Sequence, residues 1–140
     1  MAFHAKLLDA EGSQCAQVTK DGALTVAPLA GWSVSDSSTA NTAKTITKTA
    51  STTQQHIAMM VDVTVSGAAA GADIAVQLKD DTTIKWQTSI ASGTAEGTRI
   101  VAEFPAGIVG TLNKNMTLTA GAGGAGCVML LNLHGYSVTA

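Results

Sequence analysis

A few side chains in this 140-residue chain have the chemistry that catalysis needs. Asp62 and Glu103 are the carboxylates that could act as a general acid and base. Asp62, however, lies in an apolar run in which Met60, Thr64 and Ser66 would share its face of a strand. We therefore interpret this face as solvated or interfacial rather than as an active site.

The other reactive side chains do not group by spacing. His4, His56 and His134 lack the separations of zinc ligands, and we expect His134 to be a partly buried histidine of the last strand. Cys15 and Cys127 are far apart, and we expect both to be small buried side chains. No serine lies in a G-x-S-x-G sequence. We therefore expect no enzyme activity, no catalytic residue, no cofactor and no metal.

The segment Gly121–Gly126 reads GAGGAG and matches G-x-G-x-x-G, the pattern of dinucleotide-binding loops. Such a loop needs a long helix after it and an acidic residue about 20 positions further on. The sequence that follows has neither. Its glycines instead predict a tight reversal between two antiparallel strands, over residues 116–120 and 127–136.

Alternating apolar and polar residues predict an all-β chain, an antiparallel β-sandwich. In one strand Ile74, Val76 and Leu78 would share a face, and in the next Ile84, Trp86, Thr88 and Ile90 would do so. Asp80 and Asp81 are predicted to close a hairpin between these strands rather than to bind a metal. The expected strands span residues 42–48, 55–67, 72–80, 82–90, 97–104, 115–120 and 126–138.

Composition excludes several partners. The chain has 8 basic residues, which are scattered, and a net charge of −2, so we expect no specific nucleic acid partner. Its longest nearly uncharged stretch, residues 121–140, is broken by glycines, so we expect no membrane span. The N-terminus lacks the apolar core of a signal peptide, so secretion by that route is not expected. Charged residues make up only 13% of the chain, which suggests that a partner covers much of the surface.

We divide the chain into three parts. Residues 1–32 are predicted to be an arm with a short hairpin, residues 33–50 a polar linker or first strand, and residues 51–140 the sandwich. The hairpin would join residues 14–19 and 23–26 around Lys20-Asp21-Gly22. The arm is too small to form its own core, so its apolar side chains are predicted to anchor the protein to a partner. These side chains are Phe3, Leu7, Leu8, Val18, Leu24, Val26, Leu29 and Trp32.

Four stretches carry a family resemblance: GSQCAQVTKDGALTVAPL (12–29), ADIAVQLKDDTTIKWQTSI (72–90), GTRIVAEFPAGIVGTLNKNMTLTAGAGGAG (97–126) and VMLLNLHGYSV (128–138). Their style and order resemble small virion proteins of tailed bacteriophages. The resemblance implies a jelly-roll sandwich and a capsid decoration (cement) protein or head appendage that binds across subunits of the major capsid protein. It implies a homo-oligomer, with a trimer favoured over a dimer. It also implies synthesis in the bacterial host cytoplasm and a final place on the outer capsid surface.

Two other classes remain open. One is a glycan-binding or adhesion module of a phage head or tail appendage, in which Trp32, Trp86 and Tyr136 would form a sugar-stacking platform. We expect core packing for these aromatic side chains instead. The other class is a tail or connector assembly component. A lectin should lose ligand binding when Trp32 or Trp86 is removed, whereas a cement protein should raise the temperature at which capsids release DNA.

Overall fold

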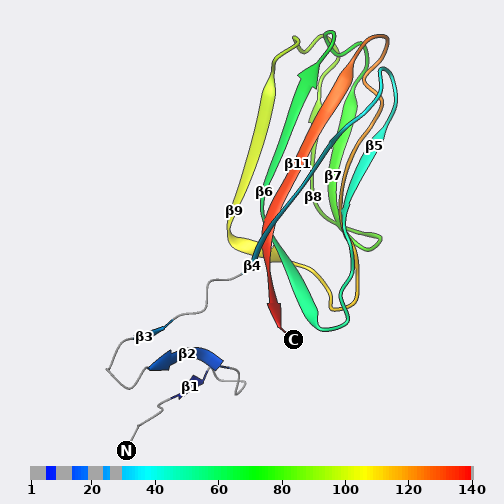
Figure 1. Cartoon of the computed structure of the whole chain (residues 1–140). Helices are drawn as coiled ribbons and strands as arrows, with labels where there is room; N and C mark the ends of the chain where they lie inside the picture. Colours follow the sequence, from blue (N-terminus) through cyan, green and yellow to red (C-terminus); the bar gives the residue numbers. More distant parts are fainter. Residues whose placement is uncertain (1–5, 9–13, 19–23, 26–29, 140) are drawn as a thin grey trace, which may run out of the picture.

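The computed structural model describes residues 6–8, 14–18, 24–25 and 30–139, and this part of the chain holds strands but no helix. Eight of the strands form two antiparallel sheets that face each other (Figure 1). One sheet has the order β4-β11-β6-β9 and the other β5-β10-β7-β8. The strands are β4 (Ala30–Ser37), β5 (Lys44–Lys48), β6 (Gln54–Ser66), β7 (Ile74–Asp80), β8 (Thr83–Ile90), β9 (Arg99–Val109), β10 (Met116–Ala120) and β11 (Val128–Thr139).

The connections make this sandwich a jelly roll. The chain crosses from one sheet to the other at every connection except that between β7 and β8, which are neighbours in one sheet. Eight strands in two such sheets are the jelly-roll arrangement. The expected all-β sandwich is therefore confirmed, and so is the hairpin at Asp80 and Asp81. Asp81 adopts a positive φ of 55°, which an aspartate in a tight turn tolerates.

The reversal expected between residues 116–120 and 127–136 is corrected by the strand order. β10 pairs with β5 and β7, whereas β11 pairs with β4 and β6. Gly121–Gly126 therefore carries the chain from one sheet to the other, and β10 and β11 are not hairpin partners. Alternation shows that each strand has a buried face but does not say which sheet it joins.

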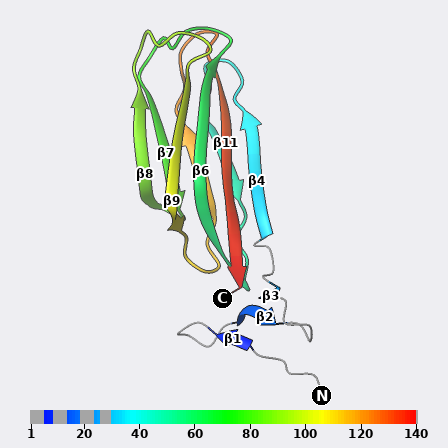
Figure 2. The ribbon, with the colours of Figure 1, turned by 90° about the vertical axis from the view of Figure 1, so that its left-hand side faces the viewer.

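A separate small sheet precedes the sandwich. β1 (Lys6–Leu8), β2 (Gln14–Val18) and β3 (Leu24–Thr25) form three antiparallel strands in that order. The pairing of β2 with β3 agrees with the predicted hairpin, whose turn lies outside the described residues. Figures 1 and 2 show these strands beyond the end of the sandwich at which β4 begins.

The core lies between the two sheets and follows from strict alternation. Ile74, Val76 and Leu78 of β7 are fully buried, as predicted, and face Leu131 and Leu133 of β11 across the core. Burial of each such side chain stabilises the fold by about 1.5–3 kcal/mol. Because both sheets contribute aliphatic side chains at every second position, the core forms without any helix.

Two bulges shift the predicted faces. In β8 the register with β7 shifts beside Lys85, so Trp86, Thr88 and Ile90 point inward but Ile84 points outward and is 45% exposed. The prediction for Ile84 is therefore wrong, because a bulge inserts one residue and inverts the alternation beyond it. In β6 the register shifts at Met59, which lines a surface pocket together with its neighbour Met60.

Residues 33–50, predicted as a polar linker or first strand, contribute two strands to the sandwich. β4 begins at Ala30 and ends at Ser37, and β5 spans Lys44–Lys48. Both are edge strands, so few of their side chains face the core: chiefly Trp32 and Val34 from β4, and Ile46 from β5. This explains why their sequence is poor in large apolar residues.

Candidate functional site

The GAGGAG segment is a packing element. Gly71 N, in the loop before β7, donates a hydrogen bond to Gly123 O at 2.7 Å. A Cβ at Gly124 would lie 3.0 Å from Gly71 Cα, and one at Gly123 would lie 2.4 Å from Cys127 Sγ. Gly124 and Gly126 also have positive φ values of 90° and 75°. The glycines therefore allow close backbone contact between two loops at the end of the sandwich. The segment is followed by β11 and not by the helix that a dinucleotide-binding loop needs.

The nearest approach to a catalytic pair is His56 with Ser137. His56 Nδ1 lies 2.8 Å from Ser137 Oγ, and His56 Nε2 lies 2.8 Å from Thr49 O. Because a carbonyl only accepts, Nε2 carries the proton and the serine hydroxyl donates to Nδ1. His56 is 3% exposed and Ser137 7%, so a substrate has no access to either. Both groups are satisfied inside the sandwich, and we assign them a structural role.

Asp62 lies on the outer face of the β4-β11-β6-β9 sheet, as the alternation predicts. Arg99 Nε donates to Asp62 Oδ1 at 2.9 Å, and Arg99 Nη2 donates to Oδ2. The hydrogen bonds and charge of Asp62 raise the pKa of Arg99 above its ordinary value. Both carboxylate oxygens of Asp62 are thus occupied, and Glu103 is opposite Met60 in the register rather than opposite Asp62. The two carboxylates do not form an acid–base pair.

The same outer face also carries a pocket. β9 bulges at Phe104–Gly107, opposite Met59 of β6, because Glu103 pairs with Met60 and Ile108 with Ala58. The bulge leaves a shallow pocket of about 290 Å³, lined by Met59, Met60, Glu103, Phe104 and Pro105. Its lining is mainly apolar with a single carboxylate, so it suits contact with an apolar side chain of a partner.

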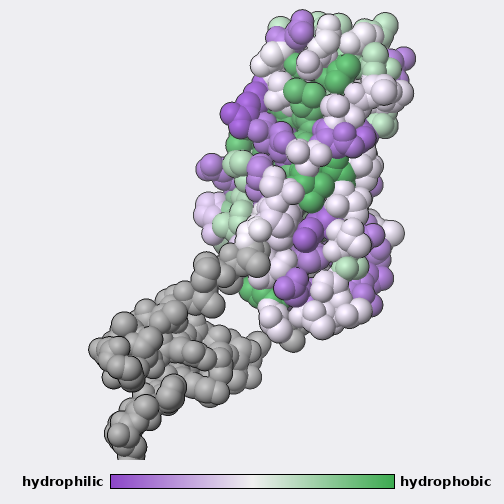
Figure 3. All heavy atoms as spheres, in the orientation of Figure 1, coloured by the Kyte–Doolittle hydropathy of each residue, from purple (hydrophilic) through white to green (hydrophobic). Residues whose placement is uncertain are grey.

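Exposed apolar side chains concentrate on this face. Five large hydrophobic residues in the described part of the chain are exposed, and three of them, Val101, Val109 and Leu130, belong to its strands and point outward. Figure 3 shows hydrophobic patches mainly in the upper half of this view, interrupted and flanked by hydrophilic surface. Sequence reasoning did not select these three residues. The sequence pattern could have identified them, because each is an apolar residue at an outward-facing position of a strand with alternating residues.

The outer face of the β5-β10-β7-β8 sheet is different in character. Thr45 of β5 and Thr119 of β10 share a hydrogen bond of 2.8 Å between their hydroxyls, and Gln77 Nε2 donates to Gln87 Oε1 at 3.3 Å. The register places these four side chains in one row across the sheet. This face is therefore polar and sparsely charged, with Lys79 beside the exposed Ile84.

The aromatic side chains proposed for sugar stacking do not form a common platform. Trp86 packs edge-on against Phe104 at 5.9 Å, where β8 and β9 meet. Trp32 is inside the opposite edge, 6.0 Å from His56, with Lys48 Nζ over its ring at 5.6 Å. Tyr136 lies on the outer face of β11, paired with Gly31. Both tryptophans pack against the core, as expected.

The predicted anchoring residues are spread over several elements. Leu7 and Leu8 belong to β1, Val18 to β2 and Leu24 to β3, whereas Trp32 is part of β4 and packs against the core. Phe3, Val26 and Leu29 lie outside the described residues. Anchoring by these residues stays a prediction.

In the described ranges of the chain, no group of three or more His, Cys, Asp or Glu side chains lies close enough to hold a metal ion. Within the same ranges, no helix has the length and apolar character needed to cross a bilayer.

Comparisons with known proteins give a distant fold resemblance. No family model and no curated protein matches the sequence. Among solved structures, a chain of the crystal structure of tomato aspermy virus is similar, with a TM-score of 0.37 and 11% sequence identity. The match covers 81% of this chain and 80% of that chain. We base no functional inference on a likeness of this size.

Proposed function

We propose that the protein is a virion structural protein that decorates and stabilises a bacteriophage capsid by binding across major capsid protein subunits. The observation that carries the proposal is the outer face of the β4-β11-β6-β9 sheet. Val101 and Leu130 are 43% and 38% exposed on this face, which also carries the methionine-lined pocket at Met59 and Met60. A partner that covers this face would bury these apolar side chains, and the charges of Asp62 and Arg99 on the same face are already paired with each other.

The chemistry of the other groups supports a binding role. Asp62 is held by Arg99, and the His56–Ser137 pair is closed off from solvent. A decoration protein needs no reaction, because its effect comes from area buried between capsid subunits. Many copies on one lattice then act together, so a modest affinity per copy still stabilises the particle against the pressure of packaged DNA.

The direct test asks whether the chain is a component of phage particles and what it does there. Particles from the source lysate are banded by density and analysed by mass spectrometry, and particles that lack the protein are mixed with the recombinant full chain. We expect stoichiometric presence, co-sedimentation and a higher temperature of DNA release. Absence from purified particles, or binding with no change in release temperature, would refute the proposed role.

Matched variants locate the surface. Leu130→Lys places a charge on the proposed face and should weaken co-sedimentation strongly. Ile84→Lys places the same charge at a comparably exposed position on the other sheet, so it should bind like the wild type. The arm is tested by deleting residues 1–29, which leaves β4 intact, whereas deletion through Trp32 would also remove a core contact. If Ile84→Lys and Leu130→Lys weaken binding equally, this face is not the binding surface.

A further inference from the structure

β4 has one paired side and one open side. It pairs with β11 along its length without a register shift, and Figure 2 shows it at the margin of the sandwich, with no described strand beyond it. Just past this ladder, Ser38 N donates to Met129 O at 2.9 Å. Along an antiparallel pair, residues alternate between bonding to the partner strand and pointing away from it. Counting back from Ser38, the residues whose backbone points away from β11 are Ser37, Ser35, Ser33 and Gly31.

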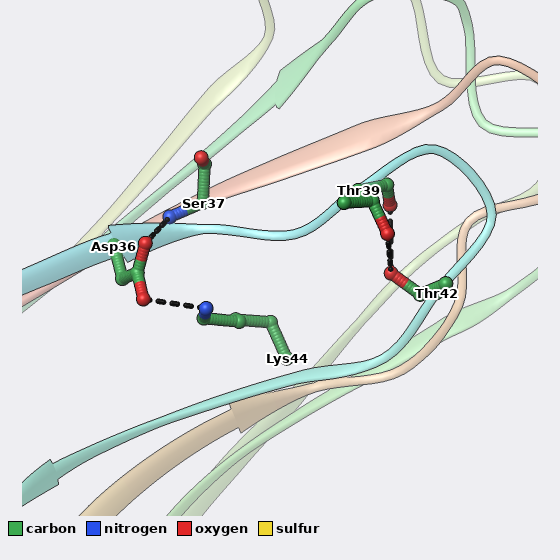
Figure 4. Close-up of polar contacts among 5 residues, drawn as sticks. All are labelled: Asp36, Ser37, Thr39, Thr42 and Lys44. Atoms are coloured by element: carbon green, nitrogen blue, oxygen red, sulfur yellow. Dashed lines mark hydrogen bonds and ion pairs between the residues drawn. The ribbon is translucent and has the colours of Figure 1, made fainter.

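Asp36 covers the upper end of this open side. Ser37 N donates to Asp36 Oδ1 at 2.8 Å, and Asp36 Oδ2 pairs with Lys44 Nζ of β5 (Figure 4). The Ser37 donor is therefore already used. The backbone groups that remain for another strand belong to Gly31, Ser33 and Ser35.

The other three edge strands of the sandwich are less suited to pairing. β5 has only five residues and carries Lys44 and Lys48 at its ends. β8 has a register shift beside Lys85. β9 has a register shift with Pro105 in it, and charged side chains of Arg99 and Glu103 along its outer face. Bulges, prolines and charges are the features that protect edge strands from pairing. β4 has eight residues, no register shift and no ionisable side chain between Gly31 and Ser35.

We propose that β4 pairs with β4 of a second copy of this chain, antiparallel and about a two-fold axis at Ser33. In this register Ser33 lies opposite Ser33 of the second copy, and Gly31 lies opposite Ser35. With the symmetry-related pair of Ser35 and Gly31, this gives three hydrogen-bonded pairs, each joined by two backbone hydrogen bonds. The pairing uses the backbone groups of Gly31, Ser33 and Ser35 and stops where the Asp36 contact begins.

The side chains fit the same register. Gly31, Ser33 and Ser35 are exposed on the outer face and are small, so two copies approach without a steric clash. On the inner side, Trp32 of one copy lies across from Val34 of the other, and both are only half-buried in the single chain. No residue from Gly31 to Ser35 is ionisable, so the paired segments themselves bring no like charges together. The contact is isologous, which closes a dimer; this differs from the trimer that the family resemblance implies.

Charge variants at the two-fold axis test the pairing. The mass of the full chain is measured by size-exclusion chromatography with light scattering, and wild type is expected at the mass of two chains. Ser33→Lys and Ser33→Asp each place like charges directly opposite each other, so each alone should run as one chain. An equal mixture of the two variants should restore the mass of two chains, because opposite charges then meet.

The matched control is Ser89→Lys, at an exposed serine on the edge strand β8, which should leave the dimer intact. Unfolding temperatures of all variants confirm that each is folded. A monomeric wild type, a dimeric Ser33→Lys variant, or equal dissociation by Ser89→Lys would each overturn the proposal. The measurement detects only self-association, so its result tests the dimer independently of any binding to phage particles.

Discussion

The packing of Trp32 against Gly135 can be tested by two separate substitutions, Gly135→Ala and Gly31→Ala, each of which adds one methyl group. A Cβ at Gly135 would lie 2.1 Å from Ile57 O and 2.5 Å from Trp32 Cζ2. The first neighbour is backbone and the second is a ring held against His56, so neither moves easily. A Cβ at Gly31, on the paired strand, has no neighbour nearer than 3.9 Å.

The expected effects have opposite signs. Gly135→Ala should cost about 1–3 kcal/mol, the usual range for overpacking a core. For a domain of this size, that corresponds to a fall in unfolding temperature of about 4–12 °C. Gly31→Ala should stabilise by about 0.4–1 kcal/mol, because it restricts the unfolded chain without a clash. Gly31 does not have the positive φ that would make alanine strained.

Urea unfolding followed by tryptophan fluorescence gives both free energies of unfolding, and circular dichroism gives the unfolding temperatures. Trp32 lies at the site and is one of the two tryptophans of the chain, so the emission includes a contribution from the changed surroundings. If Gly135→Ala is as stable as the wild type, or if Gly31→Ala destabilises as much as Gly135→Ala, the packing described for Trp32 and Gly135 is wrong.

Three further predictions address other contacts. Ser137→Ala leaves buried His56 Nδ1 without a donor and should lower the free energy of unfolding by about 1–3 kcal/mol in urea titrations; an unchanged midpoint would contradict the hydrogen bond. The hydrogen bonds from Lys44 and from the Ser37 backbone lower the pKa of Asp36 in the folded chain. The ionised carboxylate therefore stabilises the fold at pH values above the unfolded-state pKa. This stabilisation is lost as the pH falls through the folded-state pKa. Between about pH 5 and pH 2, the wild type should therefore lose slightly more thermal stability than Asp36→Asn, and parallel curves would refute this. Cys127 is fully buried, so in a Cys15→Ser background a thiol reagent should modify it only as fast as the chain opens, and a rate unaffected by urea would count against its burial.

Alternation predicted β7 because its apolar and polar residues alternate along the whole strand. Ile74, Val76 and Leu78 are buried as expected, and the pairing of β7 with β10 has no register shift. The predicted inward position of Ile84 was wrong because pairing with β7 produces the bulge beside Lys85. A single sequence carries no sign of this bulge. The edge strands β4 and β5 were hard to recognise because an edge needs few inward apolar side chains.

The candidate surface was only partly accessible from sequence. The outward position of Asp62 follows from alternation, but its pairing with Arg99 depends on β6 and β9 lying side by side, although the two residues are 37 positions apart. The pocket at Met59 arises from two irregularities that meet, one in each strand. Neither irregularity has a local sequence signal, so the position of the pocket requires the fold.

The place of β11 has a consequence for how the protein is made. β11 is the last sandwich strand to leave the ribosome, yet it lies between β4 and β6 and supplies Met129, Leu131 and Leu133 to the core. Until it is synthesised, β4 has no partner strand and one side of β6 is open. The sandwich therefore closes only after translation has passed residue 139, and the nascent chain carries unpaired strands until that moment.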